Sequence, residues 1–356
     1  MRNAVIIIPA LNPDEKLIKY CNDLIEADFQ KIILVDDGSD EEHRPVFDTL
    51  KALPQCSVLR HAVNLGKGRA LKNAFNYFLN MENRDNFCGV ITADSDGQHR
   101  VEDVIKIQEA LSAVGEVLIL GARDFNSDNV PPKSRFGNKN SIFLLRLLHG
   151  MKLQDTQTGL RGIPTTILPK YLDIFGERFE YETGMLVATA RCGIKYLEIP
   201  IETIYENENK GTHFRPIKDS LAVLSVLLGT FFKYMISSIL SFLIDIGIFK
   251  LMLVIIASLN ISDGKRILIA TVVSRVLSSL FNFTVNKNVV FDSKANKGIL
   301  LLKYYILCVI QMGCSAGLVT GLFMLTHLPE TVVKIIIDAI LFIISYHIQR
   351  KFIFNK

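Results

Sequence analysis

Residues 87–98 read Phe-Cys-Gly-Val-Ile-Thr-Ala-Asp-Ser-Asp-Gly-Gln, an apolar run that ends in two aspartates separated by one serine. A short, continuous apolar run bounded by polar residues is typical of a strand that is buried on both faces of a sheet. The same pattern, an apolar run followed by acidic or amide side chains, occurs at Ala4–Asn12 and at Lys31–Ser39. We therefore expect these three stretches to form the core strands of one sheet.

Helical patterns lie between these strands. Apolar residues recur with helical spacing over Asp14–Ala27 and Lys67–Met81, a further helix is expected from about Val101, and Val117–Gly121 is another strand candidate. Strands that alternate with helices favour an α/β, Rossmann-like fold with a mostly parallel sheet. In such sheets ligands bind beyond the carboxyl ends of the strands, which is where the polar clusters stand.

The last third of the chain is far more apolar. Four segments are each long enough to cross about 30 Å of hydrocarbon: Phe231–Ala257, Ile267–Val290, Leu301–Leu325 and Val332–Phe352. We therefore expect an α/β domain over 1–214, a juxtamembrane amphipathic segment over 215–230 and an all-α domain of four transmembrane helices over 231–356. The juxtamembrane segment either lies along the membrane surface or packs on the α/β domain.

Basic residues are distributed unevenly around the four spans. Lysines surround the connector between the second and third spans, and Arg350, Lys351 and Lys356 lie at or just beyond the end of the fourth. By the positive-inside rule, we expect a multi-pass protein of the cell membrane with both termini and the α/β domain in the cytoplasm. The apolar run after Met1 is too short for a signal peptide, which agrees with that orientation. A net charge of +4 does not suggest nucleic-acid binding, and the six cysteines show no metal-like spacing.

The membrane segment contains a weak internal repeat. Asn282–Phe291 and Ser345–Phe354 each combine polar, aromatic and basic residues before a closing phenylalanine. This similarity predicts a duplicated two-helix hairpin, although span ends often share such residues. Arg275 and Asp338 correspond in the repeat, and Asp245 also lies within an apolar segment. We expect Arg275 to pair with one of these aspartates, because ionised side chains inside a membrane normally face a partner.

The pair of aspartates after the third core strand is a candidate metal site. The carboxylates of Asp94 and Asp96, on either side of Ser95, can approach one hard cation, and Gln98 offers a further oxygen. Mg²⁺ and Mn²⁺ accept such ligands and share their remaining positions with phosphate oxygens. An Asp-x-Asp pair also occurs in solvated turns, but its place at a strand end favours the metal site.

Other strand ends and loops offer groups for a nucleotide and its phosphates. Asp36 and Asp37 can accept hydrogen bonds from a base or a ribose, although Asp-Gly-Ser is also a turn sequence. Asn64–Ala70 opens a helix in which glycines and Lys67 favour an anion, and Glu182 is a candidate sugar contact. Three arginines can bind phosphate, with a surface salt bridge as the alternative for each: Arg123, Arg135 and Arg161.

A basic stretch precedes the first span. Lys210, His213 and Arg215 stand where the phosphate of a lipid would arrive. The alternative is that these residues anchor the chain to anionic lipids.

As an ordered set, these motifs resemble family-2 glycosyltransferases of the GT-A fold, in the branch of dolichol-phosphate mannose synthase and bacterial polyprenyl-phosphate glycosyltransferases. The matching stretches, spread over about residues 3–220, are Ile8–Asn12, Val35–Ser39, Asn64–Ala70, Asp94–Gln98, Asp155–Arg161 and Glu180–Glu182. The four-span segment is similar to a GtrA-like domain, and Asn282–Phe291 carries that likeness.

The resemblance implies an inverting transfer of a sugar from a nucleotide-sugar, with a UDP-sugar favoured, to undecaprenyl or dolichyl phosphate, which feeds cell-envelope polysaccharide glycosylation. It implies that Asp94, Asp96 and Gln98 hold Mg²⁺ or Mn²⁺, and that Asp96, Asp155 and Arg161 belong to the catalytic centre. The implied contacts to the nucleotide-sugar are Pro9, Leu11, Asn12, Asp36, Asp37, Lys67, Asp94, Ser95, Arg123 and Glu182. The implied contacts to the acceptor phosphate are Arg135, Lys210, His213 and Arg215. Because residues 210–215 depart from the arginine–serine–lysine pattern of some relatives, which of the last three meets the phosphate stays open.

Other functions also stay open on the sequence alone. The membrane domain could itself bind or translocate a lipid-linked sugar, and the donor could be GDP-mannose. A processive polysaccharide synthase is disfavoured, because the chain has no tryptophan and so lacks the Gln-x-x-Arg-Trp motif. A nucleotidyltransferase would release pyrophosphate instead of a nucleoside diphosphate. Besides donor, acceptor and bilayer, a second copy of the chain is a candidate partner.

Overall fold

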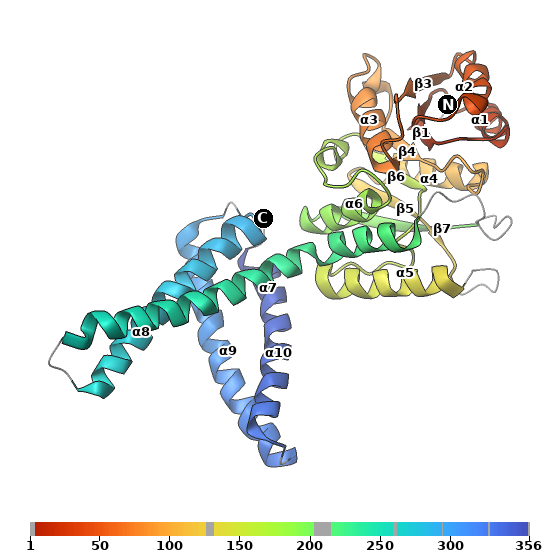
Figure 1. The fold of residues 1–356 in the computed structure, drawn as a ribbon. Coiled ribbons are helices and arrows are strands. Elements are labelled where there is room, and N and C mark those ends of the chain that lie inside the picture. Colours follow the sequence, from red (N-terminus) through yellow and green to blue (C-terminus); the bar gives the residue numbers. More distant parts are fainter. Residues whose placement is uncertain are drawn as a thin grey trace. The chain divides into compact units, whose positions relative to one another are not determined.

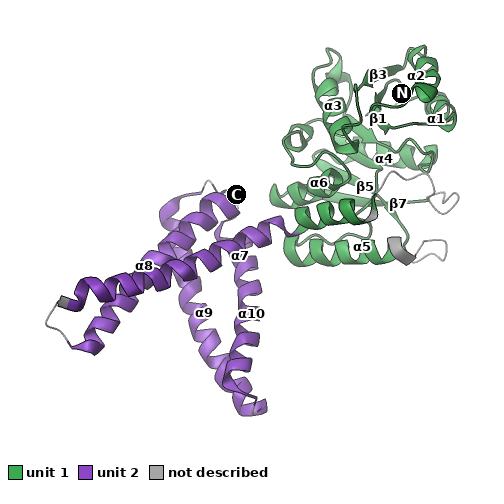
Figure 2. Ribbon diagram, viewed as in Figure 1, with its two compact units in different colours: residues 1–227 green, residues 228–356 purple. Residues whose placement is uncertain are grey.

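The chain folds into two compact units, Met1–Leu227 and Leu228–Lys356 (Figure 2). The structure, a computed structural model, describes residues 4–125, 132–202, 215–258, 262–293, 295–326 and 328–354. The first unit is an α/β domain and the second is built from long helices.

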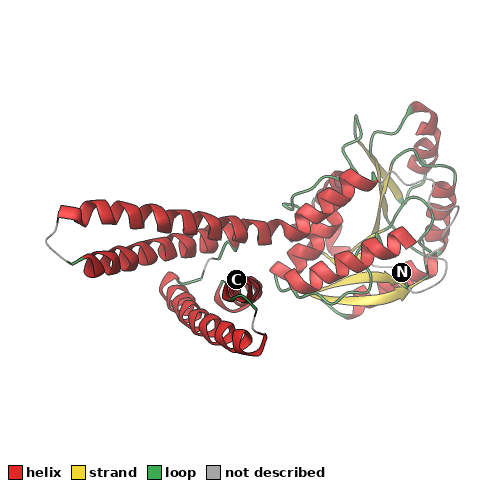
Figure 3. Cartoon of the chain, turned by 60° about the horizontal axis from the view of Figure 1, so that its bottom comes forward, coloured by secondary structure: helices red, strands yellow, loops and turns green. Residues whose placement is uncertain are grey.

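The first unit is built on a seven-stranded sheet with the order β3-β2-β1-β4-β6-β5-β7 (strands in yellow in Figure 3). Its strands are β1 (Ala4–Ala10), β2 (Ile32–Asp36), β3 (Cys56–Arg60), β4 (Gly89–Thr92), β5 (Val117–Arg123), β6 (Arg161–Pro164) and β7 (Lys195–Ile201). Four of the six pairings among these described strands are parallel, and β6 runs antiparallel to both β4 and β5. The mostly parallel, Rossmann-like sheet predicted from the sequence is confirmed, with β6 as an antiparallel insertion.

Helices cover both faces of this sheet (Figure 1). The longer helices are α1 (Lys16–Glu26), α2 (Arg44–Lys51), α3 (Lys67–Leu79), α4 (Val101–Ala113), α5 (Pro132–Leu144) and α6 (Glu180–Arg191). Short helical turns occupy Glu41–His43, Arg84–Asn86, Leu145–His149 and Leu168–Tyr171. Because strand side chains alternate, Val5 and Ile7 pack toward α3 and α6, while Ile6 and Ile8 pack toward α1, α2 and α4. The continuous apolar runs are thus explained by burial on both faces.

The second unit provides most of four helices that are long and apolar enough to cross a membrane. They are α7 (Pro216–Ile255), α8 (Asp263–Val285), α9 (Lys297–Thr326) and α10 (Glu330–Ile348). A short helical turn over Ile256–Ser258 follows α7. α7 is continuous through the expected juxtamembrane segment and the first expected span. Its first turns belong to the first unit, where Val223 packs beside the buried Leu227 on the α3–α6 side of the sheet.

The predicted repeat has a structural counterpart in the second unit. α8 ends in a π-helical turn over Asn286–Val290, and α10 ends in the same kind of turn over Gln349–Ile353. The first residues of the two turns meet, with Asn286 Nδ2 donating to Gln349 Oε1 at 3.1 Å. Phe291 and Phe354, which follow the turns, stack with ring centroids 5.3 Å apart. Corresponding residues therefore contact each other across the boundary between the two hairpins.

The hairpins also contain the ionised residues found in the apolar segments. Arg275 Nε lies 3.6 Å from Asp245 Oδ2, as one of the two expected pairings requires. Asp338 instead pairs with Lys334 at 2.8 Å and accepts a hydrogen bond from Ser315 at 2.7 Å. Each hairpin thus carries its own polar contact between neighbouring helices, because an unpaired charge within hydrocarbon is costly.

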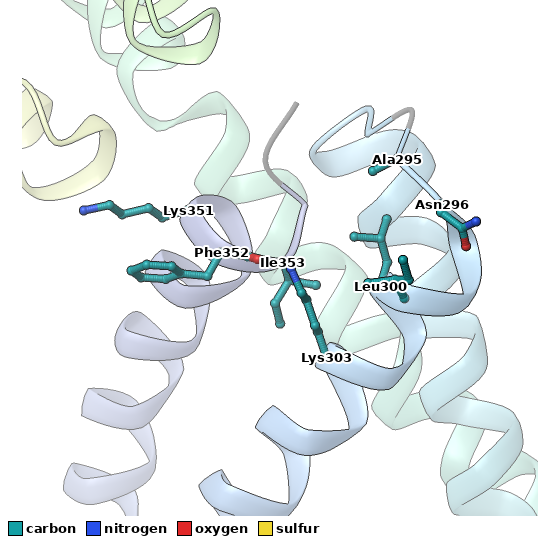
Figure 4. A pocket seen from close by; sticks show the side chains of 8 residues that line it. Ala295, Asn296, Leu300, Lys303, Lys351, Phe352 and Ile353 are labelled. Atoms are coloured by element: carbon teal, nitrogen blue, oxygen red, sulfur yellow. Dashed lines mark hydrogen bonds between the residues drawn. The ribbon is translucent and has the colours of Figure 1, made fainter.

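One open pocket of the second unit lies where α9 begins and α10 ends (Figure 4). Its volume is about 330 Å³, and its lining includes Leu300, Ile353 and Lys303. Lys303 reaches across it, with its Nζ 3.4 Å from the carbonyl oxygen of Phe352, while Lys351 points away. The pocket contains none of the predicted site residues.

Candidate active site

The predicted site begins where three adjacent parallel strands end. In the register of the sheet, Ala10 of β1 stands opposite Asp36 of β2, and Ile7 of β1 stands opposite Thr92 of β4. The segments that follow these strands therefore leave the same edge of the sheet side by side. This is the edge at which open α/β sheets bind ligands.

Lys67 connects two carboxylates that are far apart in the sequence. Its Nζ lies 2.7 Å from Asp94 Oδ1 and 2.9 Å from Glu182 Oε2. Lys67 is the first residue of α3, Asp94 follows β4, and Glu182 lies in the first turn of α6. Burial would lower the pKa of Lys67, but the two carboxylates outweigh it and raise that pKa. The ammonium is therefore held in its charged form between three elements.

The second oxygen of Asp94 is also engaged. The Nε2 atom of His99 lies 3.3 Å from Asp94 Oδ2, and the His99 ring is buried. Burial would raise the pKa of Asp94, but Lys67 and His99 outweigh it and hold that pKa below its ordinary value. A Cβ atom on Gly159 would stand 2.3 Å from Asp94 Oδ2, so only glycine leaves room for this carboxylate. Thr92 fixes the same glycine by donating to its carbonyl at 2.7 Å.

Asp96 differs from Asp94 in its surroundings. Its residue is exposed, and its Oδ1 accepts a hydrogen bond from the backbone N–H of Gln98 at 3.1 Å. Among the described residues, no cationic side chain is paired with it. Partial desolvation and the charge of Asp94 raise its pKa. Ser95, between the two aspartates, is half-buried.

These residues fit a divalent cation. Asp94 and Asp96 are neighbouring carboxylates, and no cationic side chain in the described part of the chain neutralises the charge of Asp96, so the pair attracts a cation. Among the described residues, no cluster of three histidine, cysteine or acidic side chains forms a complete metal site. The remaining ligands would have to come from the Gln98 amide, water or a bound phosphate. Such a shared shell suits Mg²⁺ or Mn²⁺ in a phosphate-binding site.

The ends of β1 and β2 form a tightly bonded pair of loops. The backbone N–H of Asn12 donates to Ser39 Oγ at 2.9 Å, and its side chain exchanges hydrogen bonds with Asp40. Asp36 and Asp37 are both buried. Asp36 accepts the backbone N–H of Ser39 at 2.8 Å, and Arg60 lies 3.5 Å from its other oxygen.

Asp37 organises the entry to α3. Its carboxylate accepts backbone N–H groups of Leu65 and Gly66 at 2.9 and 2.8 Å, and His61 Nδ1 lies 2.7 Å from it. Asp37 therefore sets the position from which Lys67 extends.

Two predicted site residues precede Asn12. Pro9 is buried within β1, and Leu11 is half-buried.

A second ion pair lies at the end of β5. Arg123 Nε lies 2.6 Å from Asp155 Oδ2, and its Nη2 lies 3.1 Å from Oδ1, so the planar guanidinium contacts both oxygens. Asp155 is buried, and the chain from Asp155 leads to Gly159 beside Asp94. The two ion pairs are thus connected through one short segment.

The other predicted arginines occupy different surroundings. Arg161, the first residue of β6, is buried, and its Nε and Nη1 donate to the carbonyls of Thr158 and Glu182 at 3.0 and 2.8 Å. Arg135 is half-buried on α5. Arg215 is exposed and pairs with the buried Asp219 at 3.1 Å. Lys210 and His213 lie outside the residues that the structure describes.

His99 is a site residue that the sequence analysis did not select. It follows Gln98 directly, but nothing in the local pattern distinguishes a buried partner of Asp94 from an exposed histidine at the entry to α4. Its role follows from geometry alone, because the turn after Asp96 brings the ring back onto Asp94.

A Rossmann-like sheet with an Asp-x-Asp pair at the end of a central strand defines a GT-A type of glycosyltransferase domain. Comparison with known families agrees: residues 5–171 match the model of glycosyl transferase family 2, and residues 233–354 match the GtrA/DPMS transmembrane domain. The protein is a glycosyltransferase of family 2 whose catalytic domain is fused to a GtrA-like membrane domain.

Three relatives match over a little more than half of the chain. A protein of Methanocaldococcus jannaschii, named only as uncharacterised, is 28% identical over 204 residues, 56% of this chain and 81% of the relative. A UDP-N-acetylglucosamine–dolichyl-phosphate N-acetylglucosaminyltransferase of Methanococcus voltae is 26% identical over 221 residues, 56% of this chain and 85% of the relative. A dolichyl-phosphate beta-glucosyltransferase of Trichomonas vaginalis is 24% identical over 216 residues, 55% of this chain and 64% of the relative.

Proposed function

We propose that the protein transfers a sugar from a nucleotide-sugar to a polyprenyl phosphate, with inversion at the sugar C1 and with a divalent cation at Asp94 and Asp96. The observation that carries the proposal is the Lys67 ammonium, which bridges Asp94 and Glu182 at the ligand-binding edge of the sheet, beside the exposed Asp96. A site with both carboxylates and an ammonium suits a sugar nucleotide, whose diphosphate needs cations and whose sugar needs hydrogen-bond acceptors.

The acceptor is inferred from the second unit and from the relatives. Four helices suited to a membrane place the enzyme at a lipid surface, where a lipid-borne phosphate is available. Two of the relatives are named for transfer to dolichyl phosphate, with different sugars. The shared acceptor class supports a polyprenyl phosphate, while the sugar stays open. A UDP-sugar is the donor we favour.

The chemistry requires little from a general base. A phosphate oxygen of the acceptor is an anion at neutral pH, so it can attack C1 directly, and attack in line with the leaving group inverts that carbon. Bound Mg²⁺ or Mn²⁺ would neutralise the charge that develops on the departing nucleoside diphosphate. Lys67 supplies a further positive charge beside the aspartates, and Asp155 orients Arg123 at the rim of the same edge.

The remaining predicted site residues would bind the nucleotide, bind the acceptor phosphate or support the site. Asp36, Asp37 and the chain around Pro9, Leu11 and Asn12 would form the nucleotide side of the site. Arg135, Arg215, Lys210 and His213 would receive the acceptor phosphate, and Arg161 would support the site from behind through the carbonyl of Glu182. We place the catalytic domain, expected over 1–214, in the cytoplasm, with the basic span ends on the same side of the membrane.

A donor panel tests the proposal directly. Purified full-length protein in lipid nanodiscs is incubated with UDP- and GDP-sugars, undecaprenyl or dolichyl phosphate, and Mg²⁺ or Mn²⁺. We expect one sugar nucleotide to yield a lipid monophosphate sugar and a nucleoside diphosphate, with the anomeric configuration opposite to that of the donor. Release of pyrophosphate, retention of configuration, or full activity in EDTA would each contradict a stated part of the proposal.

A further inference from the structure

The Lys67–Asp94 contact raises a question about how a cation reaches the aspartates. Both oxygens of Asp94 already have a partner: Oδ1 faces the Lys67 ammonium at 2.7 Å, and Oδ2 faces His99 at 3.3 Å. A divalent cation bonded to Oδ1 would lie less than about 5 Å from the ammonium, where two positive charges repel each other strongly. Lys67 and a metal ion therefore compete for the same oxygen.

Of the two partners, Lys67 is the one that can move. The Asp94 carboxylate is confined, because Gly159 stands so close that a Cβ there would lie 2.3 Å from Oδ2, and because His99 is buried behind it. Lys67 has a long, flexible side chain. It also has a second anionic partner, Glu182, at 2.9 Å, so it can leave Asp94 and remain paired.

We infer that Lys67 is the resident counter-ion of Asp94 in the metal-free protein, that a divalent cation displaces it from this carboxylate, and that Glu182 then retains the ammonium beside the donor diphosphate. The inference rests on the proposed metal-assisted transfer and adds a positioning role for Lys67 and Glu182. The protein would then keep the Asp94 carboxylate neutralised until a divalent cation arrives, and the displaced ammonium would remain where the leaving group develops its negative charge.

Metal affinity distinguishes this role from a purely structural one. Mn²⁺ binding to full-length protein is measured without nucleotide, from the free Mn²⁺ signal in electron paramagnetic resonance. Removing the competing charge with Lys67→Met should tighten Mn²⁺ binding by about tenfold. Glu182→Gln should weaken it several-fold, because the displaced ammonium loses its second carboxylate. If Lys67 only held Asp94 in place, both variants would weaken binding.

A matched control lies on the same helix. Lys72 pairs with Glu177 at 3.2 Å, away from the aspartates, and Lys72→Met should leave the Mn²⁺ affinity unchanged. Thermal unfolding verifies that each variant is folded, and Lys67→Gln replaces Lys67→Met if the latter is not. Unchanged or weaker Mn²⁺ binding by the folded Lys67 variant overturns this inference alone. Wild-type protein that binds no Mn²⁺, with or without UDP, overturns both the inference and the metal-assisted function.

Discussion

Arg123 and Asp155 form a two-point ion pair between the end of β5 and the segment that leads into β6, with contacts of 2.6 and 3.1 Å. The carboxylate is fully buried, and the side chain of Arg123 is 17% exposed. Removing the cationic partner of a buried carboxylate is strongly destabilising, because the remaining charge has no compensation. The pair therefore fixes one orientation of the guanidinium at the edge of the sheet where the aspartates lie.

Two substitutions of Arg123 should give different results. Arg123→Ala leaves the buried Asp155 uncompensated, and should lower the free energy of unfolding by about 3–5 kcal/mol. Arg123→Lys keeps the charge but loses the planar two-point contact, so transfer should fall more than stability. Unfolding curves and turnover measure the two effects. Arg191→Lys on the exposed last turn of α6 is the control, and an equal loss in it would contradict the assignment.

Gly159→Ala should remove activity through Asp94. The new methyl group would meet Asp94 Oδ2 at 2.3 Å, so the carboxylate must shift and leave Lys67. We expect transfer to fall at least about 100-fold, since misplacement of a site group by about 1 Å has effects of that size. Gly137→Ala on α5 is the matched control, because its nearest neighbour is a side-chain atom 3.6 Å away. Normal turnover by Gly159→Ala would show that Asp94 is not required in this position.

Asp96→Ala should abolish transfer and leave a folded membrane protein. The side chain is exposed and accepts a single described hydrogen bond from Gln98, so its loss should change the free energy of unfolding by less than about 1 kcal/mol. Loss of its charge, by contrast, weakens cation binding. Turnover at several Mg²⁺ and Mn²⁺ concentrations, with unfolding curves beside it, tests both halves. Full activity at low metal concentration would remove Asp96 from the metal site.

The Lys67–Asp94 pair should make stability depend on pH in one direction. Because the pKa of Asp94 is lowered in the folded protein, its contribution is fully present above the unfolded value of about 3.9 and is lost as the pH falls toward the folded value. The destabilisation caused by Lys67→Met should therefore be largest at pH 7 and shrink toward pH 3. Thermal unfolding across that range measures it. A difference that stays constant with pH would mean that the contact contributes through packing alone.

Asn286→Ala should loosen the membrane unit at the boundary between its hairpins. The change removes the hydrogen bond to Gln349, leaves a buried amide without this partner, and should cost about 0.6–1.7 kcal/mol. Gln349→Ala should cost a similar amount, and the double variant less than the sum, because both remove the same bond. Asn288→Ala, exposed on the same turn, is the control. Strict additivity would mean that the two amides do not interact.

The core strands, and the polar residues that follow them at the edge of the sheet, could be predicted because their signals are local. Continuous apolar runs identify β1, β2 and β4, and the polar residues that follow them mark the ligand-binding edge. The sequence does not predict β6, because Arg161-Gly-Ile-Pro164 is a short strand inside a polar stretch. It does not predict β7 either, because the apolar residues of this edge strand are interrupted by charged ones. The contact of Lys67 with Glu182 depends on α3 and α6 packing on the same face, which no local pattern encodes.

The meeting of Asn286 with Gln349 has a consequence for how this membrane unit can vary. Two hairpins that contact each other through corresponding residues are arranged like the subunits of a dimer. Here they are joined in one chain, so their association does not depend on protein concentration in the bilayer. Because the two hairpins belong to one chain, their sequences can also differ at equivalent positions. The arginine at position 275 faces an aspartate in one half, while its counterpart Asp338 faces a serine and a lysine in the other. A symmetric pair of separate subunits could not assign opposite charges to equivalent positions in this way.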